Sequence, residues 1–178
     1  MPDKRLFIAV DLSDPARNAI FRVCRELPEY RWTKQEQLHL TLRFIGDIDT
    51  SIIPGLCASL SEIKFNNFEL IMTGTGFFRP SIFFLALEQS ESLNSLKGKV
   101  DSVLTDVTGM PVETREFVPH ITLTRFKRRQ NRQKLERLES AFAPVFPIRF
   151  EVDSMTLYAS ELTPRGAIHT VEGIFKAD

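Results

Sequence analysis

LHLTLRF at residues 38–44 and PHITLTRF at residues 119–126 share the pattern His-(Leu/Ile)-Thr-Leu, followed by an Arg and a Phe. The two histidines, His39 and His120, stand 81 residues apart, which is far longer than the period of a solenoid repeat. Both copies are rich in β-forming residues and alternate polar with apolar side chains, which is typical of a half-buried strand. The duplication therefore indicates two lobes that face each other.

Alternation along a strand decides which side chains share a face. His39 and Thr41 point to one face, and the leucines on either side of them point to the other. His120 and Thr122 repeat this arrangement. The same parity places Phe44 on the face of the leucines, so we expect Phe44 to pack inward.

The rest of the chain mixes strand-like and helix-like segments. Short β-rich runs predict strands at 6–10, 38–45, 68–78, 81–87, 121–126, 150–160 and 167–175, and helical spacing of apolar residues predicts helices at 13–28, 49–63, 92–107 and 131–142. The run 163–166 predicts a turn. Because the segments follow no strict βαβ repeat, the sequence favours an α+β fold with a largely antiparallel sheet or two sheets.

Composition sets the broad class of protein. The chain has 178 residues, of which 43% are hydrophobic and 26% charged, so we expect one globular domain spanning residues 1–178. Lys and Arg number 23, as do Asp and Glu, and this zero net charge argues against general binding to nucleic acid. Any contact with nucleic acid must be local.

We expect a cytoplasmic protein that does not enter a membrane. The first fifteen residues hold only a five-residue apolar run, too short for a signal peptide, and no stretch approaches the ~20 apolar residues of a membrane span. Cys24 and Cys57 form neither a Cys-x-x-Cys pair nor a disulfide framework, so we expect free thiols.

One strongly basic stretch follows the second histidine. It comprises Arg125, Lys127, Arg128, Arg129, Arg132, Lys134 and Arg137, against the single acid Glu136. The stretch either guides an RNA strand by neutralising its phosphates or is the solvated start of a helix. Among the aromatic residues, Phe77, Phe78 and Phe83 are candidates for stacking on a base, although burial is favoured for all three.

Paired His-x-Thr strands suit chemistry on a phosphate. Two imidazoles can divide acid and base work near neutral pH, and threonine hydroxyls can donate hydrogen bonds to the oxygens of an anion. A zinc site would need three or four protein ligands, and the remaining histidine, His169, lies in a segment without metal-ligand spacing. We therefore expect no metal, and we expect His169 to pack on a strand or at the surface, with stacking on a base as the alternative.

The chain resembles the 2H phosphoesterase superfamily, which is defined by two His-x-Thr-x motifs, and within it the RNA 2′,3′-cyclic phosphodiesterases, also called 2′-5′ RNA ligases. The resemblance covers nearly the whole chain. It is carried by the segments Arg5–Leu12, Leu38–Gly46, Phe117–Arg125 and Met155–Leu162.

This resemblance implies a bilobal fold with pseudo-twofold symmetry, in which antiparallel sheets flank a central cleft and helices lie outside. It implies opening of a terminal 2′,3′-cyclic phosphate of RNA to a 2′-phosphomonoester without metal or other cofactor, and reversible 2′-5′ joining of RNA ends. In these roles His39 is the general acid and His120 the general base, while Thr41, Thr122 and Arg125 hold the phosphate.

The resemblance also bears on partners. It implies RNA ends carrying a cyclic phosphate, such as tRNA fragments, or nucleotides, and no obligate protein partner. Two alternatives stay open: a module of the same fold that binds a nucleotide or an RNA end without turnover, and a phosphoesterase that acts on a small cyclic nucleotide or on ADP-ribose cyclic phosphate.

Overall fold

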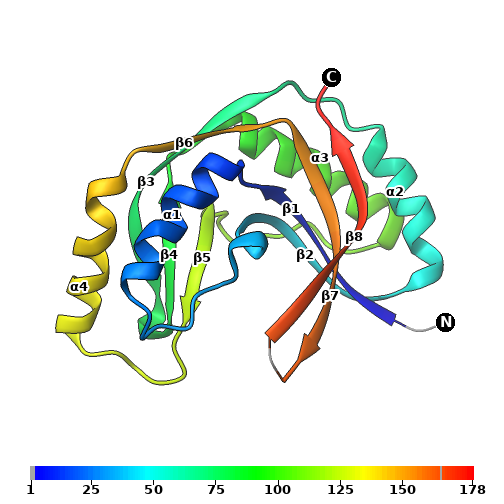
Figure 1. Ribbon diagram of the computed structural model, residues 1–178. Coiled ribbons are helices and arrows are strands. Elements are labelled where there is room, and N and C mark those ends of the chain that lie inside the picture. The colour runs from blue at the N-terminus through cyan, green and yellow to red at the C-terminus, as the bar shows by residue number, and fades with distance from the viewer. Residues whose placement is uncertain (1–2, 165) are drawn as a thin grey trace.

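The computed structural model describes residues 3–164 and 166–178. Arg165, in the predicted turn, and the first two residues, in the stretch expected not to be a signal peptide, lie outside the described residues. The elements are β1 (Asp3–Asp11), α1 (Asp14–Glu26), β2 (His39–Asp49), α2 (Ile53–Ser61), β3 (Phe68–Phe78), β4 (Ile82–Leu87), α3 (Glu91–Thr108), β5 (His120–Arg125), α4 (Arg132–Phe142), β6 (Ile148–Val152), β7 (Ser154–Thr163) and β8 (Gly166–Lys176) (Figure 1).

Two antiparallel sheets of four strands form the centre of the molecule. Their strand orders are β2-β1-β7-β8 and β5-β4-β3-β6. The strands that carry the two histidines, β2 and β5, are edge strands of different sheets and contact each other. The run β1-α1-β2-α2 is repeated as β4-α3-β5-α4, which is the structural counterpart of the duplicated motif.

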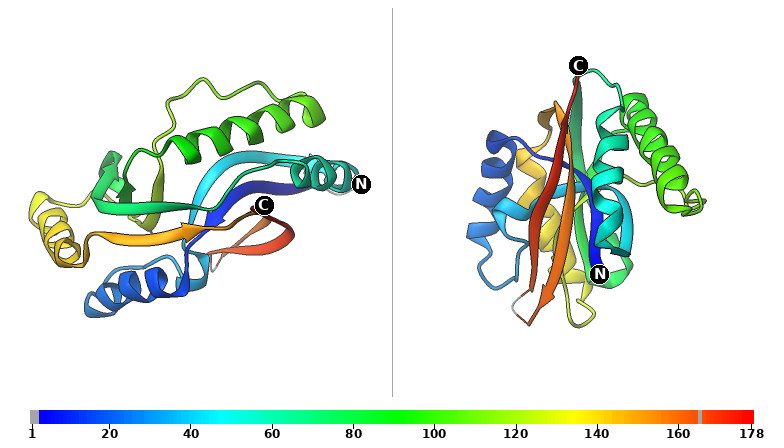
Figure 2. Two further views of the ribbon diagram at one scale, coloured as in Figure 1. Left: turned by 90° about the horizontal axis from the view of Figure 1, so that it is seen from above. Right: turned by 90° about the vertical axis from the view of Figure 1, so that its right-hand side faces the viewer.

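The helices cover the outer faces of the sheets in two pairs (Figure 2). Helices α2 and α3 lie side by side against β8 and β2, whereas α1 and α4 lie against β6 and β3. Helix α1 thus follows β1 but covers the sheet that contains β6. Helix α3 follows β4 but covers the sheet that contains β2. The expected α+β fold, with antiparallel sheets around a cleft and helices outside, is confirmed.

Strand β1 lies between β2 and β7 in its sheet, and its side chains are buried on both faces. Leu6, Ile8, Ala9 and Val10 have no exposed surface, and Phe7 is 3% exposed. This explains why the run 6–10 is continuously apolar rather than alternating. The strand that pairs with the His39 strand therefore belongs to a closely packed core, which keeps the position of His39 fixed.

One predicted strand is wrong. Residues 150–160 do not form one strand: β6 ends at Val152, Asp153 lies between the strands, and β7 begins at Ser154 in the other sheet. Buried and exposed side chains alternate in β6, whereas β7 starts with a half-buried Ser154 followed by three consecutive buried residues, 155–157. None of the described helices is long and apolar enough to span a membrane.

Candidate active site

A β-bulge interrupts each histidine strand at the same place. In β2, Arg43 pairs with Ile8 and Thr41 with Ala9, so Leu42 is an extra residue. In β5, Thr124 pairs with Phe83 and Thr122 with Phe84, so Leu123 is the extra one. From the histidine onward both strands show the same succession of half-buried, buried, half-buried, buried, buried and exposed residues.

The bulges reverse the faces of the residues that follow them. Phe44 is 65% exposed and lines the same cleft as His39, so the prediction that Phe44 packs inward is wrong. A bulge adds one residue to a strand and shifts the alternation of its side chains by one position. Counting odd and even positions along the sequence does not predict this shift. Arg125 occupies the equivalent position in β5 and likewise lines the cleft.

The cleft brings both motifs together. It has a volume of about 1430 Å³ and is lined by every residue expected at the site. These are His39, Thr41, His120, Thr122 and Arg125. The cleft also contains His169 from β8, so this histidine packs on a strand but inside the site.

The two imidazoles are held in the same way. Nδ1 of His39 lies 2.7 Å from the carbonyl oxygen of Gln37, and Nδ1 of His120 lies 2.8 Å from that of Val118. A carbonyl oxygen only accepts hydrogen bonds, so each Nδ1 carries a proton and donates it. Nε2 is therefore the nitrogen left for chemistry in both rings, and the hydroxyl of Thr41 lies 3.1 Å from Nε2 of His39.

Burial lowers the pKa of both histidines, and their charged neighbours differ in sign. For His39, desolvation outweighs the raising effects of the Gln37 carbonyl and the Asp11 carboxylate, while His169 and His120 lower the pKa further. For His120, desolvation is again the largest cause, the Val118 carbonyl raises the pKa, and Arg125 lowers it. Both rings are held in the neutral form more strongly than a histidine in water.

Aromatic rings fix the orientation of each imidazole. The ring of Phe7 lies 5.0 Å from His39, and His169 meets His39 edge-on at 5.5 Å. The rings of Phe78 and Phe84 lie 4.6 and 5.5 Å from His120, both edge-on. Of the predicted stacking candidates, Phe83 is fully buried and Phe77 packs on it, which leaves Phe78 at the site.

Asp11 and Tyr158 contribute to the site although the motifs do not include them. Asp11 pairs with His39 across β1 and β2, and its carboxylate accepts hydrogen bonds from the Tyr158 hydroxyl at 2.8 and 2.9 Å. Burial and this carboxylate raise the pKa of Tyr158 to about 12, so the phenol stays protonated. The signal available in the sequence was the charged residue that ends the apolar run 6–10.

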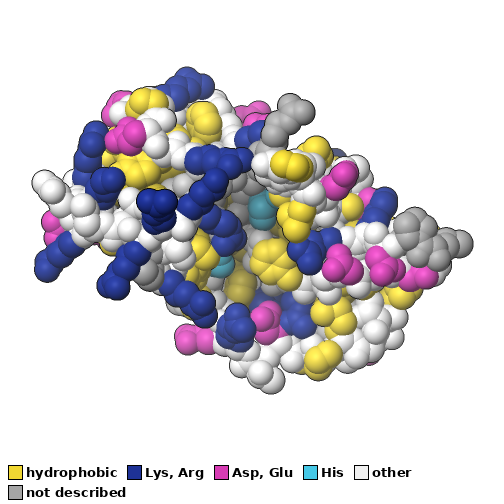
Figure 3. Space-filling view, turned by 90° about the horizontal axis from the view of Figure 1, so that it is seen from below, with side chains coloured by type: hydrophobic (Ala, Val, Ile, Leu, Met, Phe, Trp, Pro, Cys, Tyr) yellow, Lys and Arg dark blue, Asp and Glu magenta, His cyan; other side chains and the backbone are white. Residues whose placement is uncertain are grey.

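Lys and Arg side chains surround the mouth of the cleft, and histidine is visible at its floor (Figure 3). From the basic stretch 125–137, the residues lining the cleft are Arg125, Lys127, Arg128, Lys134 and Arg137, and they are joined by Arg5, Arg31 and Lys34. Glu29 is the one acid among the described lining residues, and it pairs with Arg137 at 3.2 Å. We call these eight cations the basic rim; Arg129 and Arg132 lie outside it.

The arrangement can act on a phosphate from two sides. Two imidazoles, two threonine hydroxyls and Arg125 converge on one cleft, and the basic rim favours an anion there. Within residues 3–164 and 166–178, no group of three or more His, Cys, Asp or Glu residues is close enough to hold a metal ion.

Comparison with known proteins identifies relatives over most of the chain. Residues 12–163 match the family model of the 2′-5′ RNA ligase superfamily. The RNA 2′,3′-cyclic phosphodiesterase of Thermotoga maritima is 32% identical over 178 residues, covering 94% of this chain and 92% of that protein. The protein of the same name from Methanothermobacter thermautotrophicus is 29% identical, covering 97% and 98%.

Solved structures show the same fold. Escherichia coli LigT in its apo form has a TM-score of 0.81 at 24% identity, with 99% of each chain covered. A crystal structure of a Thermus thermophilus protein has a TM-score of 0.79 at 28% identity, with 97% of each chain covered. With the paired histidine strands, the family match over most of the chain and relatives at about 30% identity, this chain belongs to the 2′-5′ RNA ligase superfamily.

Proposed function

We propose that this protein opens the terminal 2′,3′-cyclic phosphate of an RNA to a 2′-phosphomonoester, using two histidines as general acid and base and no metal. The observation that carries the proposal is the matched orientation of His39 and His120. Each donates Nδ1–H to a backbone carbonyl and keeps Nε2 for the shared cleft. The names of the Thermotoga and Methanothermobacter relatives support RNA cyclic phosphates as the substrate class.

In the proposed reaction, Nε2 of His120 accepts a proton from water as the water oxygen attacks phosphorus. The bond between phosphorus and the 3′ oxygen breaks, and Nε2 of protonated His39 donates a proton to that oxygen. The non-bridging oxygens of the phosphate are held by Thr41, Thr122 and Arg125. With a 5′-hydroxyl in place of water, the same step would form a 2′-5′ linkage.

The charged neighbours support this division of roles. The carboxylate of Asp11 favours the protonated form of His39, as a general acid requires, against the larger lowering effects of burial and of His169 on its pKa. Arg125 favours the neutral form of His120, as a base requires. A bound phosphate would raise the pKa of both rings, because its negative charge stabilises the imidazolium form. The acid would then be charged when substrate is present.

The expected partner is an RNA end rather than a membrane or an obligate protein subunit. The phosphates preceding the cyclic phosphate fit the charge of the basic rim. We place the activity in the cytoplasm, where the free thiols of Cys24 and Cys57 are stable.

The test is to incubate the protein in excess EDTA with an oligoribonucleotide that ends in a 2′,3′-cyclic phosphate, beside the His120→Ala variant. The proposal predicts a 2′-phosphate end, with the rate reduced at least ~100-fold in the variant. A 3′-phosphate product, or turnover that EDTA abolishes, would contradict it.

Two further substrates separate the alternatives. A 2′,3′-cyclic mononucleotide and ADP-ribose cyclic phosphate are assayed under the same conditions. Faster turnover of either one than of the RNA would favour a phosphoesterase of small nucleotides. RNA binding without any product would favour a binding module of this fold.

A further inference from the structure

Two connectors lead into the histidine strands. The first connector, residues 27–38, joins α1 to β2, and the second, residues 109–119, joins α3 to β5. Each connector contains the carbonyl that orients the histidine after it, Gln37 for His39 and Val118 for His120. The position of each connector therefore sets the direction of one Nε2 atom.

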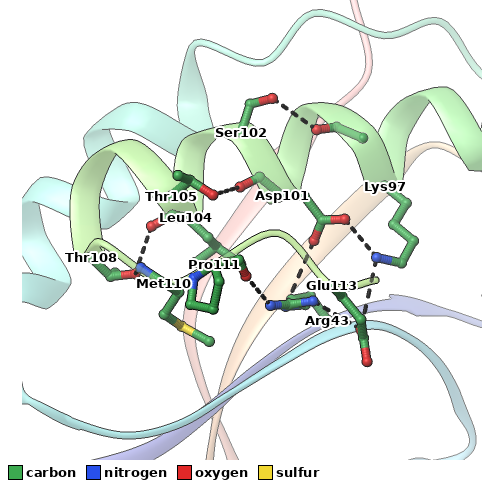
Figure 4. Close-up of polar contacts among 11 residues, drawn as sticks. Arg43, Lys97, Asp101, Ser102, Leu104, Thr105, Thr108, Met110, Pro111 and Glu113 are labelled. Atoms are coloured by element: carbon green, nitrogen blue, oxygen red, sulfur yellow. Dashed lines mark hydrogen bonds and ion pairs between the residues drawn. The ribbon is translucent and has the colours of Figure 1, made fainter. Parts of the chain in front are cut away.

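The second connector is held by β2, the strand of the opposite motif. Arg43, which follows the bulge in β2, donates one hydrogen bond from Nη1 to Glu113 and another from Nη2 to the carbonyl oxygen of Pro111, both 2.9 Å long (Figure 4). The bulge turns Arg43 away from the cleft, and its side chain is buried. Arg43 therefore ties the strand of His39 to the segment that leads to His120.

Helix α3 supports this contact with a buried ion cluster. Lys97 donates a hydrogen bond of 2.7 Å to Asp101, whose other carboxylate oxygen lies 3.7 Å from Nε of Arg43 (Figure 4). Lys97 also lies 5.3 Å above the ring of Phe117, three residues before His120. The cluster therefore contacts the second connector at both its beginning and its end.

The first connector is held by β5 in the same manner. Thr124, which follows the bulge in β5, is buried and donates a hydrogen bond of 2.7 Å to the carbonyl oxygen of Arg31. The neighbouring Thr33 donates its amide to the carbonyl of Leu123 at 2.7 Å and its hydroxyl to that of Thr122 at 3.0 Å. The strand of His120 is thus tied to the segment that leads to His39.

A buried ion cluster is not explained by stability alone. Removing charges from water costs several kcal/mol per ion, and well-packed apolar residues of similar size are often as stable. Such a cluster fixes geometry, because the hydrogen bonds from Arg43 to the second connector and from Lys97 to Asp101 form in few arrangements. Nε of Arg43 and Oδ1 of Asp101 make no hydrogen bond within the described part of the chain. Both ties start at the residue after a bulge, and both end on the connector of the other motif.

We propose that Arg43 and Thr124 are reciprocal positioning residues: each holds the connector whose carbonyl orients the histidine of the opposite strand. The inference concerns how the two halves of the site are aligned, and its catalytic consequence rests on the proposed function. Thr124 also lines the cleft, but in this account neither residue touches the reacting atoms.

The first test is imidazole ¹⁵N NMR at a pH at which the histidines are neutral, on the wild type and the Arg43→Met variant. Loss of the tie should free the second connector, so the His120 signals should shift towards a mixture of the two tautomers while those of His39 stay unchanged. With RNA substrate, kcat should fall about 10- to 100-fold with little change in KM, the scale expected when a reacting group is misplaced.

The variant Glu113→Ala distinguishes an effect on the position of the second connector from a direct effect of charge on His120. Arg43→Met removes a positive charge and Glu113→Ala a negative one, yet both cut the same tie. A positioning role predicts that both variants move the His120 signals in the same direction, whereas a direct effect of charge predicts opposite directions. Because Glu113 is partly exposed, this variant also serves if Arg43→Met does not fold.

Thr124→Val provides the reciprocal test, since it should alter the signals of His39 and leave those of His120 unchanged. Ser102→Ala in α3 is the control, because it also removes a hydroxyl that donates to a backbone carbonyl, that of Gly98, and it should alter neither ring. Changes in both rings for every variant, or in none, would overturn the proposal. The NMR result is independent of substrate, so failure of the proposed function would appear separately as absence of turnover in the wild type.

Discussion

Asp11 distinguishes the two histidines at the scale of single residues. It stands opposite His39 in the sheet, whereas the charged side chain that acts on the pKa of His120 is Arg125. A carboxylate stabilises the imidazolium form and a guanidinium destabilises it. The site is therefore asymmetric in charge although its two motifs are matched in geometry.

Asp11→Asn should lower the pKa of His39, because the substitution removes a negative charge that raises it. The amide oxygen can still accept a hydrogen bond from Tyr158, so the packing should survive. NMR titration of the imidazoles should show a lower pKa for His39 and no change for His120, and kcat/KM near neutral pH should fall as less His39 is protonated. Asp14→Asn, which removes an exposed carboxylate nearby, is the control; a raised pKa of His39 would contradict the account.

Residues in the motifs could be predicted because alternation along a strand identifies the side chains that share a face. The structure brings His39, Thr41, His120 and Thr122 into one cleft as expected. The prediction for Phe44 is wrong because residue type alone does not reveal a bulge. Asp11, Tyr158 and His169 join the site through strand pairing between distant segments, which the sequence does not specify.

At the scale of elements, a glycine on β3 makes room for the ring behind His120. Gly76 pairs with Phe84, and a Cβ atom at position 76 would lie 2.6 Å from Cζ of that ring. Phe84 in turn stacks on Phe78 at 4.2 Å and meets His120 edge-on. The position of His120 thus depends on the absence of a side chain at Gly76 in β3, the strand that pairs with β4.

Gly76→Ala should therefore displace Phe84 towards His120 or separate β3 from β4. Overpacking of this kind lowers the free energy of unfolding by ~1–3 kcal/mol, which a urea titration measures. We also expect a reduced kcat/KM. Gly74→Ala is the control on the same strand, since its Cβ would meet no atom within 4 Å; equal effects of the two substitutions would refute this role for Gly76.

Most elements could be predicted from periodicity, including α1, α3 and the hairpin of β3 and β4. The break at Asp153 could not, because β6 and β7 are both strands and only their sheet differs. Sheet membership depends on which long-range partner a strand finds, and that information is not local.

At the scale of the whole molecule, the exchange of helices links the two lobes. Helix α1 connects two strands of one sheet while packing against the other sheet, and α3 does the converse. Each sheet would lose one of its two covering helices if the two sheets separated. We therefore expect residues 1–178 to unfold as one cooperative unit.

Stability should rise with pH around neutrality. The folded-state pKa values of His39, His120 and His169 all lie below the ordinary value of 6.5, chiefly because of burial. Between those lowered values and 6.5 the unfolded chain binds more protons than the folded one, so acidification through this window favours unfolding. Urea titrations at several pH values should show a single transition whose midpoint falls as the pH falls.

The double variant His39→Asn/His120→Asn should flatten that dependence, because two of the three titrating rings are removed. An unchanged pH dependence in this variant would assign the effect to other groups. Two separate transitions in the wild type would contradict the expectation of a single cooperative domain.

The central claim is that both histidines act on one phosphate in one step, and a double-mutant cycle tests it most directly. The measurement is kcat/KM for opening of an RNA 2′,3′-cyclic phosphate by His39→Ala, His120→Ala and the combined variant. Each single change should cost at least ~100-fold, and the combined variant should lose little more than the worse single one, because the two groups act as a unit. Losses that multiply in the combined variant would contradict the paired mechanism.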